Sequence, residues 1–329
     1  MRPAMRTQPS DIELNNGYGI ALTSALVLST TGILVRHLTE TYHIPPMILA
    51  FWRTCFLSLS LLVVLELYYP YLVEIKRRDF GYLAAYGILL AVFNILWTHS
   101  VAINGASVAT LLVYSSAGFA GLLGWWFLDE ELSPVKILAI ALCLTGCAMV
   151  SGFFGVERLV SINPLGILIG ILSGLGYGIY SLMGRSACQR GLNPWTTLLY
   201  TFGFASLFLL LSNLMTMDFA PWGEAKVTDF LWLGSAVKGW SCLVLLAVGP
   251  SLIGFGLYNI SLGRLPSSTV NLIATAEPAF TALLAFLLLG EILGPLQLAG
   301  GLLIIGSVLS LQFFERRRLA PVLEQGEKA

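Results

Sequence analysis

The sequence predicts an all-α polytopic membrane protein with ten transmembrane helices, arranged as two inverted repeats of five helices. Composition, a series of long apolar segments and an internal repeat predict this fold. Of the 329 residues, 57% are hydrophobic and 11% are charged, whereas a soluble domain carries about 25% charged residues. We therefore expect the lipid bilayer to surround most of the molecule. Lys plus Arg and Asp plus Glu both total 18, so the charge balance does not indicate a nucleic-acid partner.

Ten apolar segments are long enough to cross a bilayer, which takes about 20 helical residues. They cover residues 17–36, 46–67, 80–101, 106–127, 135–152, 164–184, 195–213, 240–262, 267–289 and 295–313. Several of them begin with a helix-start signal, because proline is favoured at the first helical position. These signals are Ser133-Pro134, Asn193-Pro194 and Gly294-Pro295.

Basic residues predict the orientation, since cytoplasmic loops carry an excess of Lys and Arg. With the N-terminus in the cytoplasm, thirteen basic residues fall in inner segments, four in outer segments, and Arg53 within a span. We therefore expect a multi-pass protein of the plasma membrane with both termini in the cytoplasm. Residues 1–16 and 314–329 are then short cytoplasmic tails.

An internal repeat relates residues 17–152 to residues 164–313. A shift of 149 residues aligns the first spans of the two halves and places Arg36 on Arg185, and a shift of 160 residues aligns the later spans. One loop, longer in the second half, absorbs the difference of eleven residues. The pairs matched at the second shift are Ser107 and Ser267, Glu131 and Glu291, Leu138 and Leu298, and Gly146 and Gly306.

Each half contains five predicted spans. Because five is odd, the second half must enter the bilayer from the opposite side. Inverted repeats of this kind are typical of secondary transporters, whose substrate site lies near the midplane between the halves.

The end of each half carries a distinctive sequence pattern. It reads LLGWWFLDEELSPVKILAIALCLTGCAMV in the first half and EPAFTALLAFLLLGEILGPLQLAGGLLIIGSVL in the second, and the second span contains AFWRTCF. These segments resemble the EamA-type branch of the drug/metabolite transporter (DMT) superfamily, over about residues 17–313. The second half matches the family pattern well. The first departs from it at Gly118, where the family often has proline, and at Asp129-Glu130-Glu131, which replaces Leu-Gly-Glu.

The resemblance implies ten helices, an inward-facing N-terminus and the export or exchange of small metabolites. Members of the superfamily carry amino acids, sugars, nucleosides or drugs, so the cargo stays open. We expect a secondary transporter that works by alternating access. Proton coupling, exchange and facilitated diffusion remain alternatives for its energy supply.

Glu277 is the first candidate for a substrate or proton site. It lies near the middle of the ninth span, where an ionisable group costs about 2.5–3.5 kcal/mol to insert. The next residue is Pro278, whose ring leaves the carbonyl of Ala274 without its helical hydrogen bond. A carboxylate beside such a break can bind a cation or carry a proton. The structural alternative is a hydrogen bond that holds the halves together.

Three further candidates are Arg53, His99 and Asn259. Arg53 in the second span could hold an anionic group of the substrate, pair with Glu277, or extend to the outer headgroups. His99 and Asn259 occupy matched repeat positions, which suggests facing walls of one cavity. Hydrogen-bonded packing of the histidine is the competing interpretation.

The remaining candidates are polar side chains inside spans. Each could contact substrate or hydrogen-bond between helices, a contact worth about 0.6 kcal/mol. A ladder of four glycines along the sixth span predicts a close helix crossing or a surface on which spans one and six slide. The polar candidates are Asn94, Tyr114, Asn271 and Thr275, and the ladder consists of Gly166, Gly170, Gly174 and Gly178.

Other classes of function find less support in the sequence. It contains no HExxH, no GxSxG, no Gly-rich phosphate loop and no Cys/His cluster, so we expect no catalytic residues, cofactor or metal. Cys143 and Cys147 stand one helical turn apart and are expected to be packing residues. A channel or a non-transporting membrane subunit remains an alternative, and a membrane-embedded enzyme is a more distant one. Oligomerisation is possible but not indicated.

Overall fold

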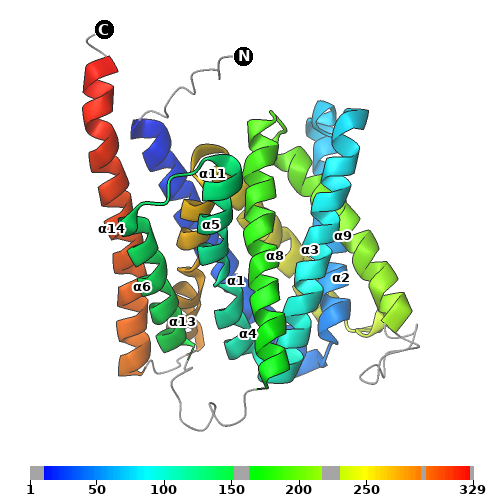
Figure 1. Cartoon of the computed structure of the whole chain (residues 1–329). Coiled ribbons are helices and arrows are strands. Elements are labelled where there is room, and N and C mark those ends of the chain that lie inside the picture. Colours follow the sequence, from blue (N-terminus) through cyan, green and yellow to red (C-terminus); the bar gives the residue numbers. More distant parts are fainter. Residues whose placement is uncertain (1–10, 152–162, 217–229, 290–293, 327–329) are drawn as a thin grey trace.

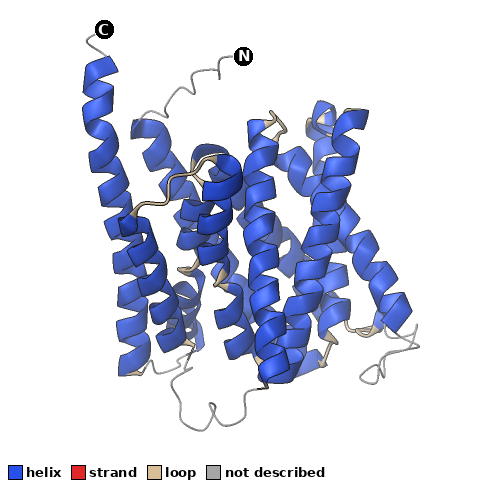
Figure 2. Ribbon diagram, in the orientation of Figure 1, coloured by secondary structure: helices blue, strands red, loops and turns tan. Residues whose placement is uncertain are grey.

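A computed structural model describes residues 11–151, 163–216, 230–289 and 294–326, and the regular elements of these ranges are all helices (Figures 1 and 2). The first half contains α1 (Asp11–Tyr42), α2 (Pro46–Tyr68), the short 3-10 helix η1 (Pro70–Leu72), α3 (Arg77–Asn104), α4 (Ala106–Val113), α5 (Ser116–Leu128) and α6 (Pro134–Val150). The second half contains α8 (Pro164–Gln189), α9 (Pro194–Thr216), α10 (Val237–Leu246), the π-helical η3 (Ala247–Ile253), α11 (Gly254–Arg264), α12 (Ser267–Ala274), α13 (Glu277–Leu289) and α14 (Pro295–Gly326).

The predicted all-α polytopic fold is confirmed. Within the described residues, eight helical segments are long and apolar enough to cross a membrane. The apolar helix α6 is shorter, at 17 residues. The pair α12 and α13 covers 267–289, the ninth predicted span.

The predicted helix-start signals are present. Prolines stand at the first position of α6, α9 and α14. The Ser133 hydroxyl accepts a hydrogen bond from the Lys136 amide at 3.2 Å, and the Asn193 side chain accepts one from the Trp195 amide at 2.9 Å. Side-chain oxygens at these positions satisfy amides that have no partner inside the helix.

The first and last helices are longer than the spans predicted from hydropathy. α1 begins at Asp11, and α14 continues through Gly326. Hydropathy identifies the part of a helix that lies in lipid, and the helix itself can continue beyond it. α1 begins and α14 ends at the same end of the bundle, whereas α8 begins at the other end (Figure 1). We call these the terminal end and the far end.

Two spans are broken at matched positions. Tyr114 and Ser115 separate α4 from α5, and Thr275 and Ala276 separate α12 from α13. Ser115 and Thr275 correspond under the shift of 160 residues, and each donates its hydroxyl hydrogen to a carbonyl three residues earlier at 2.6 Å. Such side-chain bonds compete with the helical ladder. Pro278 adds a second cause in α13, as the sequence predicts.

The glycine ladder of α8 forms a close helix crossing, as predicted, but its partners are α3, α4 and α5. A methyl group at Gly170 would lie 2.9 Å from the Cβ atom of Leu112, and one at Gly178 would lie 3.0 Å from that of Phe119. The alternative in which this ladder slides along α1 is therefore wrong. The Ser24 hydroxyl of α1 instead donates to the Gly254 carbonyl at 2.8 Å, which joins α1 to α11.

Candidate functional site

The two helix breaks bring together groups from both halves of the chain. Glu277 is the first residue of α13 and is partly buried. The Tyr114 hydroxyl, from the break between α4 and α5, hydrogen-bonds to the Glu277 carboxylate. Arg53 of α2 interacts electrostatically with the same carboxylate. Residues far apart in the sequence thus come together at the two breaks, where both spans lose their helical hydrogen bonding.

Arg53 is held in place by α3. Its Nη2 atom donates to Asn94 Oδ1 at 3.1 Å, and Asn94 Nδ2 donates to the Leu90 carbonyl at 2.8 Å. The bond to Leu90 orients the amide so that its oxygen faces the guanidinium. Among the described residues, the buried Nε atom of Arg53 has no hydrogen-bond partner. The guanidinium therefore keeps donor capacity for an anionic group.

Glu277, Tyr114, Arg53 and Asn94 form one group, which we call the central site. It presents a carboxylate and a guanidinium in surroundings of low polarity, where Coulomb interactions are stronger than in water. Such a pair can hold a positive and a negative group of one small molecule. Discontinuous helices at the repeat interface are a common setting for substrate and ion sites in transporters.

Asn271 belongs to a neighbouring hydrogen-bond network. Its Oδ1 atom accepts from the Ser116 hydroxyl at 2.7 Å, and its Nδ2 atom donates to Ser181 Oγ at 2.6 Å and to the Tyr258 hydroxyl at 3.4 Å. Both ends of the amide are thus satisfied between helices. Tyr177 links this network to the central site, because its ring stacks on Tyr258 at 6.0 Å and it also interacts with Glu277.

Thr275 shapes the break beside the central site. Its hydroxyl donates to the Leu272 carbonyl at 2.6 Å, and its own carbonyl accepts from the Cys147 thiol at 3.5 Å. Cys143 is also buried and faces the Ile304 carbonyl of α14 at 3.9 Å. Both thiols lie in the packing of α6 against its neighbours.

His99 and Asn259 do not form facing walls of one cavity. His99 lies in the last part of α3, near the far end, and its Nδ1 atom is 2.8 Å from the Ile95 carbonyl. Asn259 is close to the end of α11 at the terminal end, where it neighbours Tyr180. The physical reason is the inversion itself, which moves equivalent positions to opposite ends of the bundle. The expectation from the repeat was therefore wrong.

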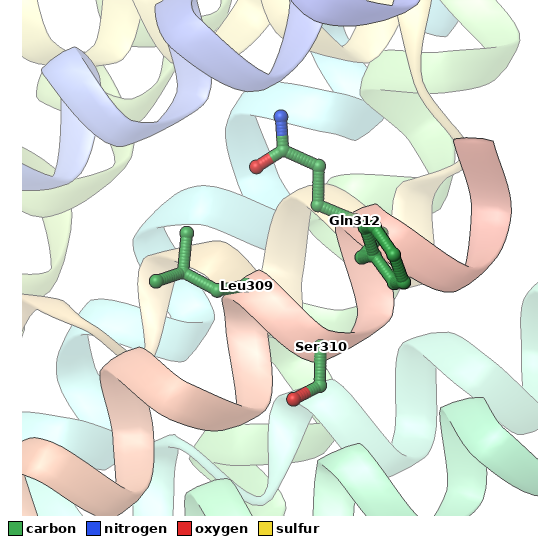
Figure 3. Close-up of a pocket in the computed structure, with 4 residues that line it drawn as sticks. Leu309, Ser310 and Gln312 are labelled. Atoms are coloured by element: carbon green, nitrogen blue, oxygen red, sulfur yellow. The ribbon is translucent and has the colours of Figure 1, made fainter. Parts of the chain in front are cut away.

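A surface hollow on α14 lies apart from the predicted residues. Leu309, Ser310, Gln312 and Phe313 line it, and all four belong to this one helix (Figure 3). None of the predicted site residues takes part in it. We therefore define the central site by the contacts among its side chains and not by this hollow.

Sequence reasoning missed a group of buried charges at the terminal end. Lys136 is one of the thirteen basic residues that the predicted orientation places in inner segments, yet it is only 3% exposed. Glu130 was treated only as a departure from a family pattern, yet it is 9% exposed. The signal that could have found Lys136 is its position two residues after Pro134, inside the first turn of α6.

Comparisons with known proteins agree with this architecture. The sequence matches the EamA-like transporter family over residues 15–152 and again over residues 164–312. An uncharacterized transporter of Archaeoglobus fulgidus is 28% identical over 224 residues, which make up 67% of this chain and 73% of that protein. The transporter YvbV of Bacillus subtilis is 25% identical over 87% of this chain and 88% of its own length.

A relative that is named for its substrates and a solved structure are also similar. The threonine/homoserine exporter RhtA of Escherichia coli is 24% identical, with 77% of each chain covered. One crystal structure superposes with a TM-score of 0.71 over 92% of this chain and 98% of its own chain, at 16% identity. At that identity, the likeness concerns the fold alone.

Proposed function

Because the chain belongs to the EamA-like transporter family and is thus a membrane transporter, we propose that it is a secondary transporter which exports or exchanges a small metabolite by alternating access. The observation that carries this proposal is the central site. Opposite charges from α2 and α13 meet there at two helix breaks, one in each half. The binding residues proposed first are Glu277, Arg53, Tyr114 and Asn94.

The chemistry of the central site favours a zwitterion as cargo. A carboxylate on the substrate would bind Arg53, whose planar guanidinium matches carboxylate geometry. An ammonium group would bind Glu277. An amino acid has both groups on one carbon, and RhtA, which is 24% identical to this chain, is named as an exporter of threonine and homoserine. Sugars and uncharged nucleosides would leave both charges unmatched, at a cost in affinity.

Glu277 is also the proposed proton carrier. A carboxylate that binds either a proton or a cationic group can couple proton movement to substrate movement, since the two ligands compete for the same negative charge. Tyr114 contacts the Glu277 carboxylate through a hydrogen bond, and Arg53 interacts with it through charge. Protonation would loosen both contacts and release the bound ammonium group.

The proposed location is the plasma membrane, with the terminal end in the cytoplasm. The excess of Lys and Arg in the segments assigned to this side supports the orientation. A cysteine placed between α9 and α10, within residues 217–236, should react with an impermeant maleimide added outside intact cells. Reaction only after permeabilisation would contradict this orientation.

Thermal unfolding of the purified protein tests the substrate class directly, because a ligand stabilises the state that it binds. The panel contains amino acids, sugars, nucleosides and cationic drugs. We expect a rise in Tm with one or more amino acids, and none in the variant Arg53→Met. The control variant is Glu40→Gln, which alters an exposed carboxylate of α1 and should respond as the parent does. A rise with sugars alone would contradict the zwitterion proposal.

A further inference from the structure

A cluster of charged and hydroxyl side chains ties the two halves together at the terminal end. The cluster, which we call the clasp, consists of Tyr18, Glu130, Lys136, Ser268 and Glu315. Tyr18 lies in α1, Glu130 precedes α6, and Lys136 lies in its first turn. Ser268 and Glu315 lie in α12 and α14 of the second half. The clasp is distinct from the central site, since it shares no residue with it.

Glu130 caps α12 from the opposite half of the chain. Its carboxylate accepts hydrogen bonds from the Ser267 amide at 2.6 Å, the Ser268 amide at 3.2 Å and the Ser268 hydroxyl at 2.8 Å. These amides are among those that a helix leaves unsatisfied at its start, and the helix dipole favours a negative charge there. Asp129 adopts the left-handed conformation, with φ of 52°, in the turn that presents Glu130.

Lys136 completes the connection. Its Nζ atom donates to the Ser268 hydroxyl at 3.2 Å and pairs with Glu315 Oε1 at 3.4 Å. The other oxygen of Glu315 accepts a hydrogen bond of 2.5 Å from the Tyr18 hydroxyl. The Thr269 hydroxyl donates to Glu315 Oε1 at 3.3 Å. The clasp thus runs without interruption from the connection before α6, through α12, to α14 and α1.

Burying charges in this way is a costly means of stabilising a fold. Transfer of an ion into a protein interior carries a penalty of several kcal/mol, and apolar residues of similar size often stabilise as well or better. Breaking such a pair on one side leaves a buried charge without compensation. An arrangement of this kind therefore favours two discrete states, with all of the contacts formed or all of them exchanged for water.

Two members of the clasp have apolar counterparts at the far end. Under the shift of 160 residues, Ser268 corresponds to Val108 and Lys136 corresponds to Leu296. Both of those side chains are apolar, so neither can take part in an ion pair. At these two described positions, the repeat thus preserves the helices but not the contacts of the clasp.

We propose that the clasp is the latch of the terminal-end entrance, and that it must open before the central site can be reached from that end. α12 begins at the clasp and ends at the break that leads into Glu277. Release of Ser267 and Ser268 would free the start of α12 and uncouple it from α6 and α14. The proposal rests on the alternating access proposed above, but not on the identity of the substrate.

Distance measurements between spin labels test the latch without any substrate. The full chain is reconstituted in lipid nanodiscs after replacement of its five cysteines. Labels are attached through Leu138→Cys on α6, which is exposed, and Arg264→Cys at the end of α11, also exposed. We expect Glu130→Gln to raise the ratio of long to short distances by about tenfold, a typical coupling between two states. Ser268→Ala should raise it in the same direction.

The control is Glu40→Gln, which removes the same charge from an exposed ion pair within α1. It should leave the distance distribution unchanged. If Glu130→Gln does not yield folded protein, Ser268→Ala and Lys136→Met decide the question. A lowered Tm with an unchanged distance distribution would overturn the latch and leave the clasp as a static cap. A shifted distribution in a protein that binds no amino acid would support the latch while contradicting the proposed substrate.

Discussion

The two broken spans have similar backbones and very different chemistry. In both, a hydroxyl residue bonds to a carbonyl three residues back, with the same 2.6 Å distance. After the first break, at the position matched to Glu277, the chain has Ala117, and at the position matched to Pro278 it has Gly118. The repeat therefore accounts for the architecture of the central site. The carboxylate of the central site stands where the two halves differ, so the charge is not part of the repeated pattern.

Arg53 shows the same asymmetry on the second span. A shift of 149 residues matches it to Phe202, which is 1% exposed and packs on Phe255. The first half thus has a charged side chain at this position, and the second half has a side chain of the hydrophobic core. Changing one member of a matched pair at a time separates the roles of the two halves.

The largest expected effect follows from Glu277→Gln. The amide keeps the size of the side chain but cannot take up or release a proton, so uptake driven by a pH gradient in vesicles should be abolished. Unfolding temperature should be close to that of the parent. The matched variant Ala117→Ser should retain transport, because its position carries no charge. Undiminished pH-driven uptake by Glu277→Gln would remove this residue as the proton carrier.

Arg53→Met should weaken substrate binding. Truncation of one partner of a buried, hydrogen-bonded charge pair costs 2 kcal/mol or more, which corresponds to about 30-fold in Kd. Titration followed by intrinsic tryptophan fluorescence would measure it. Phe202→Leu at the matched position should lower stability and leave the Kd nearly unchanged. Equal losses of affinity in the two variants would mean that Arg53 acts only through packing.

Gly174→Ala should destabilise the helix crossing. The added methyl group would lie 2.9 Å from the Leu112 carbonyl oxygen, and overpacking of this kind costs about 1–3 kcal/mol. The matched residue in α1 is Ala25, which already carries that methyl group and is buried. Chemical denaturation in detergent would compare Gly174→Ala with the parent. A stability equal to the parent's would mean that α8 can move away from α4 at little cost.

The smallest expected effects concern the break hydroxyls. Ser115→Ala and Thr275→Val each remove one bond to a carbonyl, and hydrogen bonds of this kind in membrane helices are worth about 0.6 kcal/mol. The Thr275 variant should alter transport more than the Ser115 variant. Thr275 lies two residues before the ionisable Glu277, whereas Ser115 follows Tyr114, which contributes a hydrogen bond to that carboxylate. Transport rates at saturating substrate would separate the two. Identical rates would show that the two breaks are functionally equivalent.

Much of the fold was predictable because hydropathy, prolines and the repeat are local or periodic signals. The ten spans, the start of α6 after Ser133 and the break beside Pro278 are all of this type. The break at Tyr114 was not predicted, since no proline marks it and Ser115 resembles many serines inside ordinary helices.

The central site was only partly predictable. Glu277 and Arg53 stood out because charges inside apolar segments are rare, and the structure brings them together with Tyr114 and Asn94. The bonds of Glu130 to α12 connect residues 137 and 138 positions apart, and no periodicity encodes such a pairing. The repeat matches His99 to Asn259 but does not bring them together, because one lies near the far end of the bundle and the other near the terminal end.

α12 has eight residues, and at 1.5 Å per residue its length is about 12 Å. The helix begins in the clasp and ends at the break before Glu277, so as a rigid element its start and its end rotate together. One residue added within it would turn its two ends by about 100° relative to each other. If the clasp opens as proposed, the number of residues in α12 sets the angle between the end that is released and the end that leads to the Glu277 carboxylate, and this angle can change only in steps of one residue.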